Sequence, residues 1–163
     1  GGSGDDSIRG EDGADTISGD DGADRLYGSA GNDVVNGGAG NDQIEGGSGV
    51  DVLSGGSGKD VFIFRTGDLE GTTAVNPEII LDFSRAETDI IGLSLIDAKV
   101  ATSADDAFLW IGTKTFSGIA GQLRYEVVGG DAYVSGDIDG DGRADFVLEL
   151  AGVTSLSVSD FYL

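Results

Sequence analysis

The stretch that decides the fold is residues 1–63, which divide without gaps into seven nonapeptides: GGSGDDSIR (1–9), GEDGADTIS (10–18), GDDGADRLY (19–27), GSAGNDVVN (28–36), GGAGNDQIE (37–45), GGSGVDVLS (46–54) and GGSGKDVFI (55–63). Glycine occupies the first and fourth positions of every unit. The sixth position is always aspartate: Asp6, Asp15, Asp24, Asp33, Asp42, Asp51 and Asp60. The eighth is always apolar. Three invariant positions, with a fourth that is always apolar, indicate a structural repeat rather than a low-complexity linker.

The chemistry of one unit predicts its shape. Its glycine-rich part permits a tight turn with positive φ angles, and the last three residues form a minimal strand with one inward apolar side chain. Two units then make one coil of 18 residues, with units n and n+2 stacked on the same edge. The pattern therefore predicts an all-β fold that begins with a right-handed parallel β-roll.

Stacked turns bring carboxylates and free backbone carbonyl oxygens together, and these hard oxygen donors are the ligands that calcium prefers. Stacked aspartates would repel one another without a cation between them. We therefore expect calcium to be part of the folded structure rather than an accessory to it.

The unit resembles the calcium-binding nonapeptide of RTX proteins, G-G-x-G-x-D-x-U-x. This resemblance implies several ions, about five or more, sandwiched between successive turns at Asp6/Asp24, Asp15/Asp33, Asp24/Asp42, Asp33/Asp51 and Asp42/Asp60. It also implies carbonyl ligands from the first, second and fourth positions: Gly19, Gly22, Gly28, Gly31, Gly37, Gly38, Gly40, Gly46, Gly47, Gly49, Gly55, Gly56 and Gly58. Three units depart from the pattern at the second position, with Glu11, Asp20 and Ser29.

After the repeats the composition changes, and residues 64–163 are expected to form a second, β-rich unit that caps the roll. A loop over 65–77 is followed by short apolar or alternating runs at 78–83, 89–95, 107–112, 122–128, 132–136, 144–150 and 155–163. Such runs, separated by Gly, Asp and Ser turns, predict strands of an antiparallel or mixed β-sandwich-like cap.

Several of these stretches resemble the C-terminal domain of serralysin-type secreted metalloproteases: ILDFSRAETDIIGLS (80–94), FSGIAGQLRY (116–125), GDIDGDGRADFVLELAG (136–152) and SDFYL (159–163). In that family the region is non-catalytic, supports folding outside the cell and ends in an uncleaved signal for the type I secretion machinery. The terminal Asp160-Phe161-Tyr162-Leu163 is similar to the end of that signal.

Two further metal sites are predicted beyond the repeats. By the same resemblance, Asp82 and Asp89 close the last calcium site on one edge; the alternative is an ordinary strand-end aspartate and a turn aspartate. Asp137, Asp139 and Asp141, followed by Gly142, begin like an EF-hand calcium loop, with Asp145 at the ninth position. That loop has Leu148 at its twelfth position, so a simple turn between two strands is the alternative.

Composition excludes several classes of function. The 163 residues include 30 acidic and 9 basic side chains, for a net charge of −21, and contain no histidine or cysteine. Zinc hydrolases, Ser-His-Asp hydrolases, cysteine nucleophiles and disulfides are therefore excluded. The acidity argues against nucleic-acid partners, and no apolar run is long enough to insert into a membrane.

The sequence is therefore interpreted as a non-enzymatic calcium-binding C-terminal module of an exported bacterial protein, secreted to the extracellular space. Its expected partners are calcium, the type I secretion machinery and an upstream catalytic or adhesive domain, most simply a serralysin-like metalloprotease. The alternative is a carbohydrate-binding accessory module, because similar rolls accompany alginate-modifying epimerases. The charge of the repeats argues against that alternative, with three basic residues against thirteen acidic ones.

Overall fold

A computed structural model describes residues 1–99 and 106–163. Within these residues the chain is almost entirely β-structure, with one 3-10 turn, η1 (Val158–Asp160). One sheet has nine strands, in the spatial order β1 (Gly2–Ser3), β3 (Thr16–Asp21), β5 (Val34–Ala39), β7 (Val52–Ser57), β9 (Glu78–Ile80), β14 (Phe146–Leu150), β13 (Asp131–Asp137), β12 (Gln122–Val128) and β11 (Leu109–Gly112).

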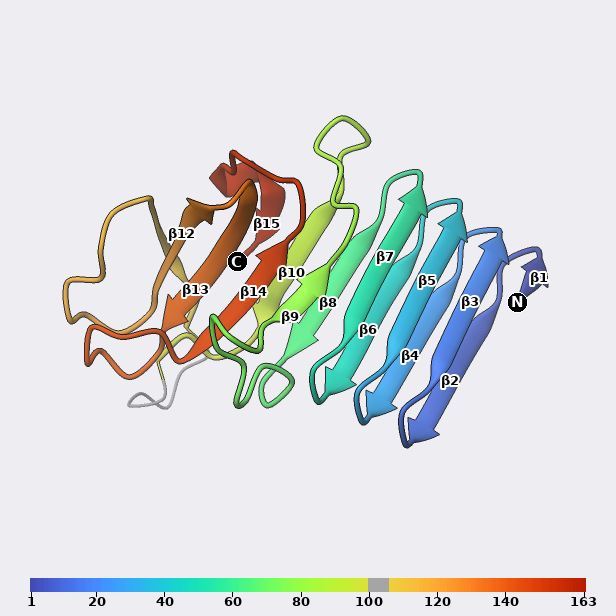
Figure 1. Ribbon diagram of the computed structural model, residues 1–163, viewed down its shortest axis with the longest axis horizontal. Helices are drawn as coiled ribbons and strands as arrows, with labels where there is room; N and C mark the ends of the chain where they lie inside the picture. Colours follow the sequence, from blue (N-terminus) through green and yellow to red (C-terminus); the bar gives the residue numbers. More distant parts are fainter. Residues whose placement is uncertain (100–105) are drawn as a thin grey trace.

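The second sheet has six strands, in the order β15 (Phe161–Tyr162), β10 (Ile90–Leu95), β8 (Val61–Arg65), β6 (Gln43–Ser48), β4 (Arg25–Ala30) and β2 (Ser7–Asp12). Figure 1 shows the coils side by side, from β1 and β2 at one end to β9 and β10, with β12–β14 beyond them. Successive repeats alternate between the two sheets, as a parallel β-roll requires.

The register confirms the 18-residue coil. Leu26 pairs with Ile44, and Val35 pairs with Leu53. Each six-residue strand takes the last three residues of one repeat and the first three of the next, so the prediction of three-residue strands was too short. Pairing runs over positions 7, 8 and 9, passes the first-position glycine and resumes at positions 2 and 3. Only positions 4–6 are therefore left to make each turn.

The eighth-position side chains form the core of the roll. Leu26, Val35, Ile44, Leu53 and Phe62 are fully buried, while Ile8, at the open end, is only partly covered. One apolar side chain is thus buried for every nine residues that must be ordered. Because ordering each residue costs conformational entropy, so thin a core contributes too little to hold the roll by itself.

The roll does not stop at the last repeat. Ile80 of β9 pairs with Leu53, and Ile91 of β10 pairs with Phe62, so one further coil of different sequence is stacked on the array. Each sheet contains strands from the repeats and strands from residues beyond 63. The hydrophobic core is continuous from Ile17 to Phe161. The division into a 1–63 roll and a 64–163 cap stays a prediction.

Six of the runs predicted beyond the repeats contain strands at their expected places: β12 has the predicted bounds, β13 is longer, and β9, β10, β11 and β14 are shorter. β12, β13 and β14 are antiparallel neighbours, while β9 lies parallel to β14 and β11 parallel to β12. The run at 155–163 is mostly not a strand: it contains η1 and the two residues of β15, which pair with β10. Among the described residues, no helix has the length and apolarity needed to span a membrane.

The turns depend on glycine for two separate reasons. Fourth-position glycines have positive φ, with 127° at Gly13 and 144° at Gly40. A methyl group on Gly40 would also collide with the Gly22 carbonyl of the preceding coil, whereas one on Gly13 would meet nothing within 4 Å. At the second position, Glu11, Asp20 and Ser29 keep positive φ values of 74°, 71° and 87°, so the turn geometry survives there.

This difference predicts unequal effects of the same substitution. Gly40→Ala and Gly13→Ala share the backbone strain, but only Gly40→Ala forces two coils apart. We expect Gly40→Ala to lower the free energy of unfolding of the calcium-loaded protein by about 1–3 kcal/mol more than Gly13→Ala. Urea unfolding followed by circular dichroism measures both; equal losses would show that stacking does not require glycine at this position.

Candidate calcium sites

The repeat aspartates form two ladders, one along each edge of the roll. On the first edge the backbone N–H of Asp6 donates to Asp24 Oδ1 at 2.7 Å, that of Asp24 to Asp42 Oδ1 at 2.8 Å and that of Asp42 to Asp60 Oδ1 at 2.9 Å. On the second edge, Asp15 and Asp33 donate in the same way to Asp33 and Asp51. Each carboxylate therefore reaches back to the coil before it, and the structure stacks all five predicted aspartate pairs.

The second carboxylate oxygen of each repeat aspartate, Oδ2, takes no part in these hydrogen bonds. Among the described residues, Oδ2 of all seven repeat aspartates is buried and has no hydrogen-bond partner. The side chains from Asp24 to Asp60 are at most 1% exposed. A buried carboxylate oxygen without a partner is costly, so a row of such oxygens indicates that something positively charged belongs beside them.

Beside Oδ2 of the first five repeat aspartates, from Asp6 to Asp42, lies a backbone carbonyl of the next coil. A methyl group placed on Gly10 would lie 2.7 Å from Asp15 Oδ2 and 2.8 Å from the carbonyl oxygen of Gly28, one coil further on. The same two kinds of oxygen surround Gly1, Gly19, Gly28 and Gly37. An aspartate oxygen and a carbonyl oxygen from the next coil thus converge beside the same glycine, and both are hard donors of the kind that calcium prefers. The residues present therefore fit a calcium ion.

The glycine carbonyls predicted as ligands differ in their positions. The carbonyl oxygens of the first-position glycines each lie beside the carboxylate of a repeat aspartate one coil earlier: Gly19, Gly28, Gly37, Gly46 and Gly55. Carbonyls of Gly22, Gly31, Gly38 and Gly40 point along the stack at the glycines of the next coil, which lie close enough to exclude any Cβ. These next-coil glycines are Gly40, Gly49, Gly56 and Gly58, while Gly47 faces the carbonyl of Ser29 in the same way. Which of these oxygens coordinate metal stays a prediction.

Asp82 and Asp89 both lie at the turn of the last repeat. Asp89 Oδ1 accepts the N–H of Asp60 at 3.0 Å, so Asp89 continues the first ladder, and its Oδ2 accepts the N–H of Ser84 at 2.7 Å. Asp82 accepts the N–H groups of Gly55 and Gly56 at 2.8 and 2.9 Å. The structure thus brings both predicted residues to the Asp60 turn, and their service as metal ligands remains a prediction.

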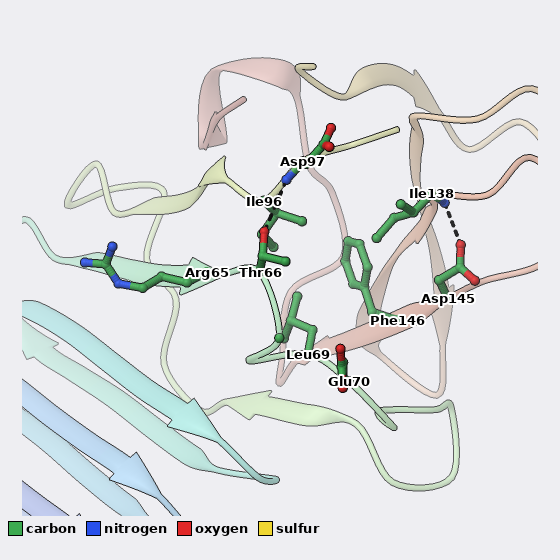
Figure 2. Close-up of a pocket in the computed structure, with 10 residues that line it drawn as sticks. Arg65, Thr66, Leu69, Glu70, Ile96, Asp97, Ile138, Asp145 and Phe146 are labelled. Carbon is green, nitrogen blue, oxygen red and sulfur yellow. Dashed lines mark hydrogen bonds between the residues drawn. The ribbon is translucent and has the colours of Figure 1, made fainter. Parts of the chain in front are cut away.

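The loop between β13 and β14 is arranged differently from its prediction. One carboxylate oxygen each from Asp137, Asp139 and Asp145 lies within 4.8 Å of the others, and Asp141 is outside this group. Asp137 is fully buried and accepts the N–H groups of Gly140 and Gly142 at 2.7 and 3.0 Å. Asp145 accepts the N–H of Ile138 at 2.6 Å, as Figure 2 shows.

These bonds are the ones that shape a turn, so the simple-turn alternative for this loop stays open. The loop also borders a cavity of about 330 Å³, drawn in Figure 2, whose walls include Leu69, Ile96, Ile138 and Phe146. The cavity adds no further acidic cluster to the candidate metal ligands within the described parts of the chain.

Comparison with known families agrees with the ladder geometry. Residues 1–35 and 27–62 match the RTX calcium-binding nonapeptide repeat (4 copies). This part of the chain carries RTX repeats. A comparison with curated proteins found no match.

Two solved structures are similar to nearly the whole chain. The AlgE6R2 subunit from the Azotobacter vinelandii mannuronan C5-epimerase is 27% identical, with a TM-score of 0.53, over 94% of this chain and 90% of that one. The AlgE6R3 subunit from the same epimerase is also 27% identical, with a TM-score of 0.48, over 99% of this chain and 80% of that one. The likeness to the AlgE6R2 subunit supports the all-β fold beyond the sequence pattern alone.

Burial raises the pKa of the ladder carboxylates near the C-terminal end of the roll. Burial raises the pKa of Asp42 and Asp89, and it raises the pKa of Asp51 and Asp60 to about 6. One buried acid was missed by the sequence interpretation: burial, together with neighbouring Asp51, raises the pKa of Glu78 to about 9. Its only sequence signal was its place at the start of the strand that follows Pro77.

These pKa directions predict opposite pH dependences with and without calcium. Because the acids bind protons more strongly in the folded than in the unfolded chain, the stability of the calcium-free fold falls as pH rises from about 4 towards 9. Calcium requires deprotonated ligands, so its stabilising effect grows over the same range. Far-UV circular dichroism in chelator and urea unfolding in excess calcium, each at about pH 5 and pH 8, check both signs; a calcium-free chain with more β-structure at the higher pH contradicts them.

Proposed function

We propose that the chain is a non-catalytic calcium-binding module of an exported protein, which stays unfolded where calcium is scarce and folds where calcium is abundant. The observation that carries this proposal is the row of seven buried aspartate oxygens without hydrogen-bond partners in the described RTX turns. A chain with net charge −21 and one buried apolar side chain per repeat cannot easily bring these carboxylates together alone.

Each part of a repeat contributes to this coupling. The aspartate N–H and Oδ1 fix the distance between coils, while the first-position glycine leaves room beside Oδ2. Calcium, when bound there, supplies the positive charge that balances the stacked carboxylates. Because an oxygen from one coil and a carbonyl from the next must both be in place, neighbouring sites form together, and binding free energy becomes folding free energy.

The finer parts of the proposal concern the parent protein. The resemblance to serralysin-type metalloproteases supports an exported parent, a type I secretion route and an extracellular location; it is carried by residues 80–94, 116–125, 136–152 and 159–163. In the folded chain two of the terminal residues are not accessible to a secretion machinery: Asp160 is buried and paired with Arg85 at 3.1 Å, and Phe161 is 6% exposed. A signal at this place would have to be recognised before the module folds.

A calcium titration tests the folding switch. Far-UV circular dichroism should show a cooperative coil-to-β transition with its midpoint in the extracellular range of roughly 10⁻⁴–10⁻³ M calcium. Magnesium is the control: it prefers a smaller octahedral shell and should not fold the chain at equal concentration. A chain fully β-structured in chelator at neutral pH would overturn the proposal and favour a permanently folded binding scaffold.

A second candidate function, binding of an acidic polysaccharide, is favoured by how the charges are distributed. The outward positions of β2, β4, β6 and β8 hold Arg9, Arg25, Tyr27 and Glu45, with Arg65 at the end of β8. The guanidinium of Arg9 lies 4.8 Å from the centre of the Tyr27 ring, and Arg65 pairs with Glu45 at 2.8 Å. The repeat aspartates lie in the turns instead, so the total charge of the repeats is a poor guide to this face.

The likeness to the AlgE6R2 subunit of a mannuronan C5-epimerase supports the same candidate. Guanidinium groups beside an aromatic ring suit carboxylated sugars, because they offer paired hydrogen-bond donors and a flat apolar surface. Under this alternative, calcium still folds the roll, and the outer face of the six-stranded sheet holds the polymer near an upstream catalytic domain.

Short mannuronan oligosaccharides distinguish the two candidates. Titration of the calcium-loaded protein, followed by amide NMR shifts, should perturb β2, β4 and β8 and weaken as salt increases. Arg25→Gln should reduce the affinity, whereas Lys59→Gln, which removes a charge from a turn, is the matched control. Equal effects of the two changes, or no perturbation of this sheet, would exclude the polysaccharide role.

A further inference from the structure

The two aspartate ladders end differently at the last coil. On the first edge, the N–H of Asp60 donates to Asp89, another aspartate. On the second edge, the N–H of Asp51 donates to Glu78 Oε2 at 3.0 Å. Val52 pairs with Ile79, so Glu78 stands opposite Asp51 in the same way that Asp51 stands opposite Asp33. Glu78 therefore occupies the rung that an eighth repeat would fill with aspartate.

Glu78 also shares the unusual feature of the repeat aspartates. It is 1% exposed, and its second oxygen, Oε1, is buried without a hydrogen-bond partner in the described structure, as is Asp51 Oδ2. Two buried carboxyl groups in contact cannot both be ionised unless a cation or a shared proton lies between them. The partnerless oxygens meet at one turn, so they point to a ligand rather than to an ordinary surface cluster.

The neighbouring backbone shows why a glutamate is suited to this place. A methyl group on Gly28 would lie close to both an aspartate oxygen and the Gly46 carbonyl of the next coil, whereas the three atoms nearest to one on Gly46 all belong to Asp51. No eighth glycine-rich turn follows in the sequence before β9. Glu78, whose side chain is longer than that of aspartate, brings a second carboxylate to the turn of Asp51.

We propose that Asp51 and Glu78 together bind a calcium ion, so that the metal ladder extends one site beyond the last RTX repeat. This inference rests on the proposed calcium-dependent function and adds a site and a ligand to it. The ion belongs at the junction of β7 with β9, and β9 in turn pairs with β14. The site therefore links calcium binding in the roll to the sheet formed by β12–β14.

The competing arrangement is a proton shared between Asp51 and Glu78, with no metal. Burial and the charge of Asp51 raise the pKa of Glu78, which allows such an acid pair in the absence of calcium. The two arrangements differ in what Glu78→Gln does. The amide replaces a protonated acid well, but it removes the negative charge that a calcium site needs.

Counting bound calcium on the full chain separates these arrangements. Native mass spectrometry at saturating calcium should show one ion fewer in Glu78→Gln than in the unmodified chain, and no change in Glu70→Gln, an exposed control. Calcium should also raise the unfolding midpoint of Glu78→Gln less than that of the unmodified chain. An unchanged ion count and an unchanged calcium-induced shift would overturn the Asp51–Glu78 site while leaving the folding proposal intact.

A measurement on the unmodified chain covers the case in which Glu78→Gln does not fold. The ¹³C carboxyl resonance of Glu78, followed by NMR at neutral pH in saturating calcium, should lie at the ionised position. A resonance at the protonated position under these conditions excludes Glu78 as a ligand. If the unmodified chain binds no calcium at all, the proposed function fails first, and the two failures are distinguishable.

Discussion

The structure depends on the different environments of the two oxygens in each repeat aspartate carboxylate. Oδ1 of each repeat aspartate accepts the N–H of the aspartate one coil earlier and so sets the spacing of the stack. Oδ2 is left in a buried place with no hydrogen-bond partner in the described chain. The hydrogen bond to Oδ1 therefore fixes the geometry in which burial of the unpaired Oδ2 costs free energy. The fold thus has a built-in requirement for positive charge, which a hydrophobic roll of the same shape would lack.

Glycine makes this arrangement possible because the coils approach one another through the backbone rather than through side chains. A Cβ on Gly31 or Gly40 would overlap a carbonyl of the preceding coil, and a Cβ on a first-position glycine would fill the space beside Oδ2. Glycine is thus required at these positions because neighbouring coils approach too closely for a Cβ, as well as because of positive φ angles. The first coil has no predecessor within the described chain, and there Gly4 and Gly13 would meet no atom within 4 Å.

The repeat region was predictable because its periodicity is regular: the positions of the aspartates, the eighth-position core and the 18-residue coil all follow from spacing. The extra coil formed by β9 and β10 was not, because Ile80 and Ile91 are separated from Leu53 and Phe62 by 27 and 29 residues instead of 18. Glu78 was missed for the same reason. In the β13–β14 loop, spacing suggested Asp141, but the turn folds back and places Asp145 beside Asp137 and Asp139.

The pairing of β15 with β10 sets an order in time. β10 contains residues 90–95, yet its outer edge is covered by residues 161–162, and Arg85 is held by Asp160. During synthesis, a ribosome releases residue 90 long before residue 161, so this edge stays open while the intervening chain is made. The six-stranded sheet cannot close on a nascent chain until its last strand has emerged. Late closure leaves one edge of the six-stranded sheet exposed until residues 161–162 have been made, independently of any ion.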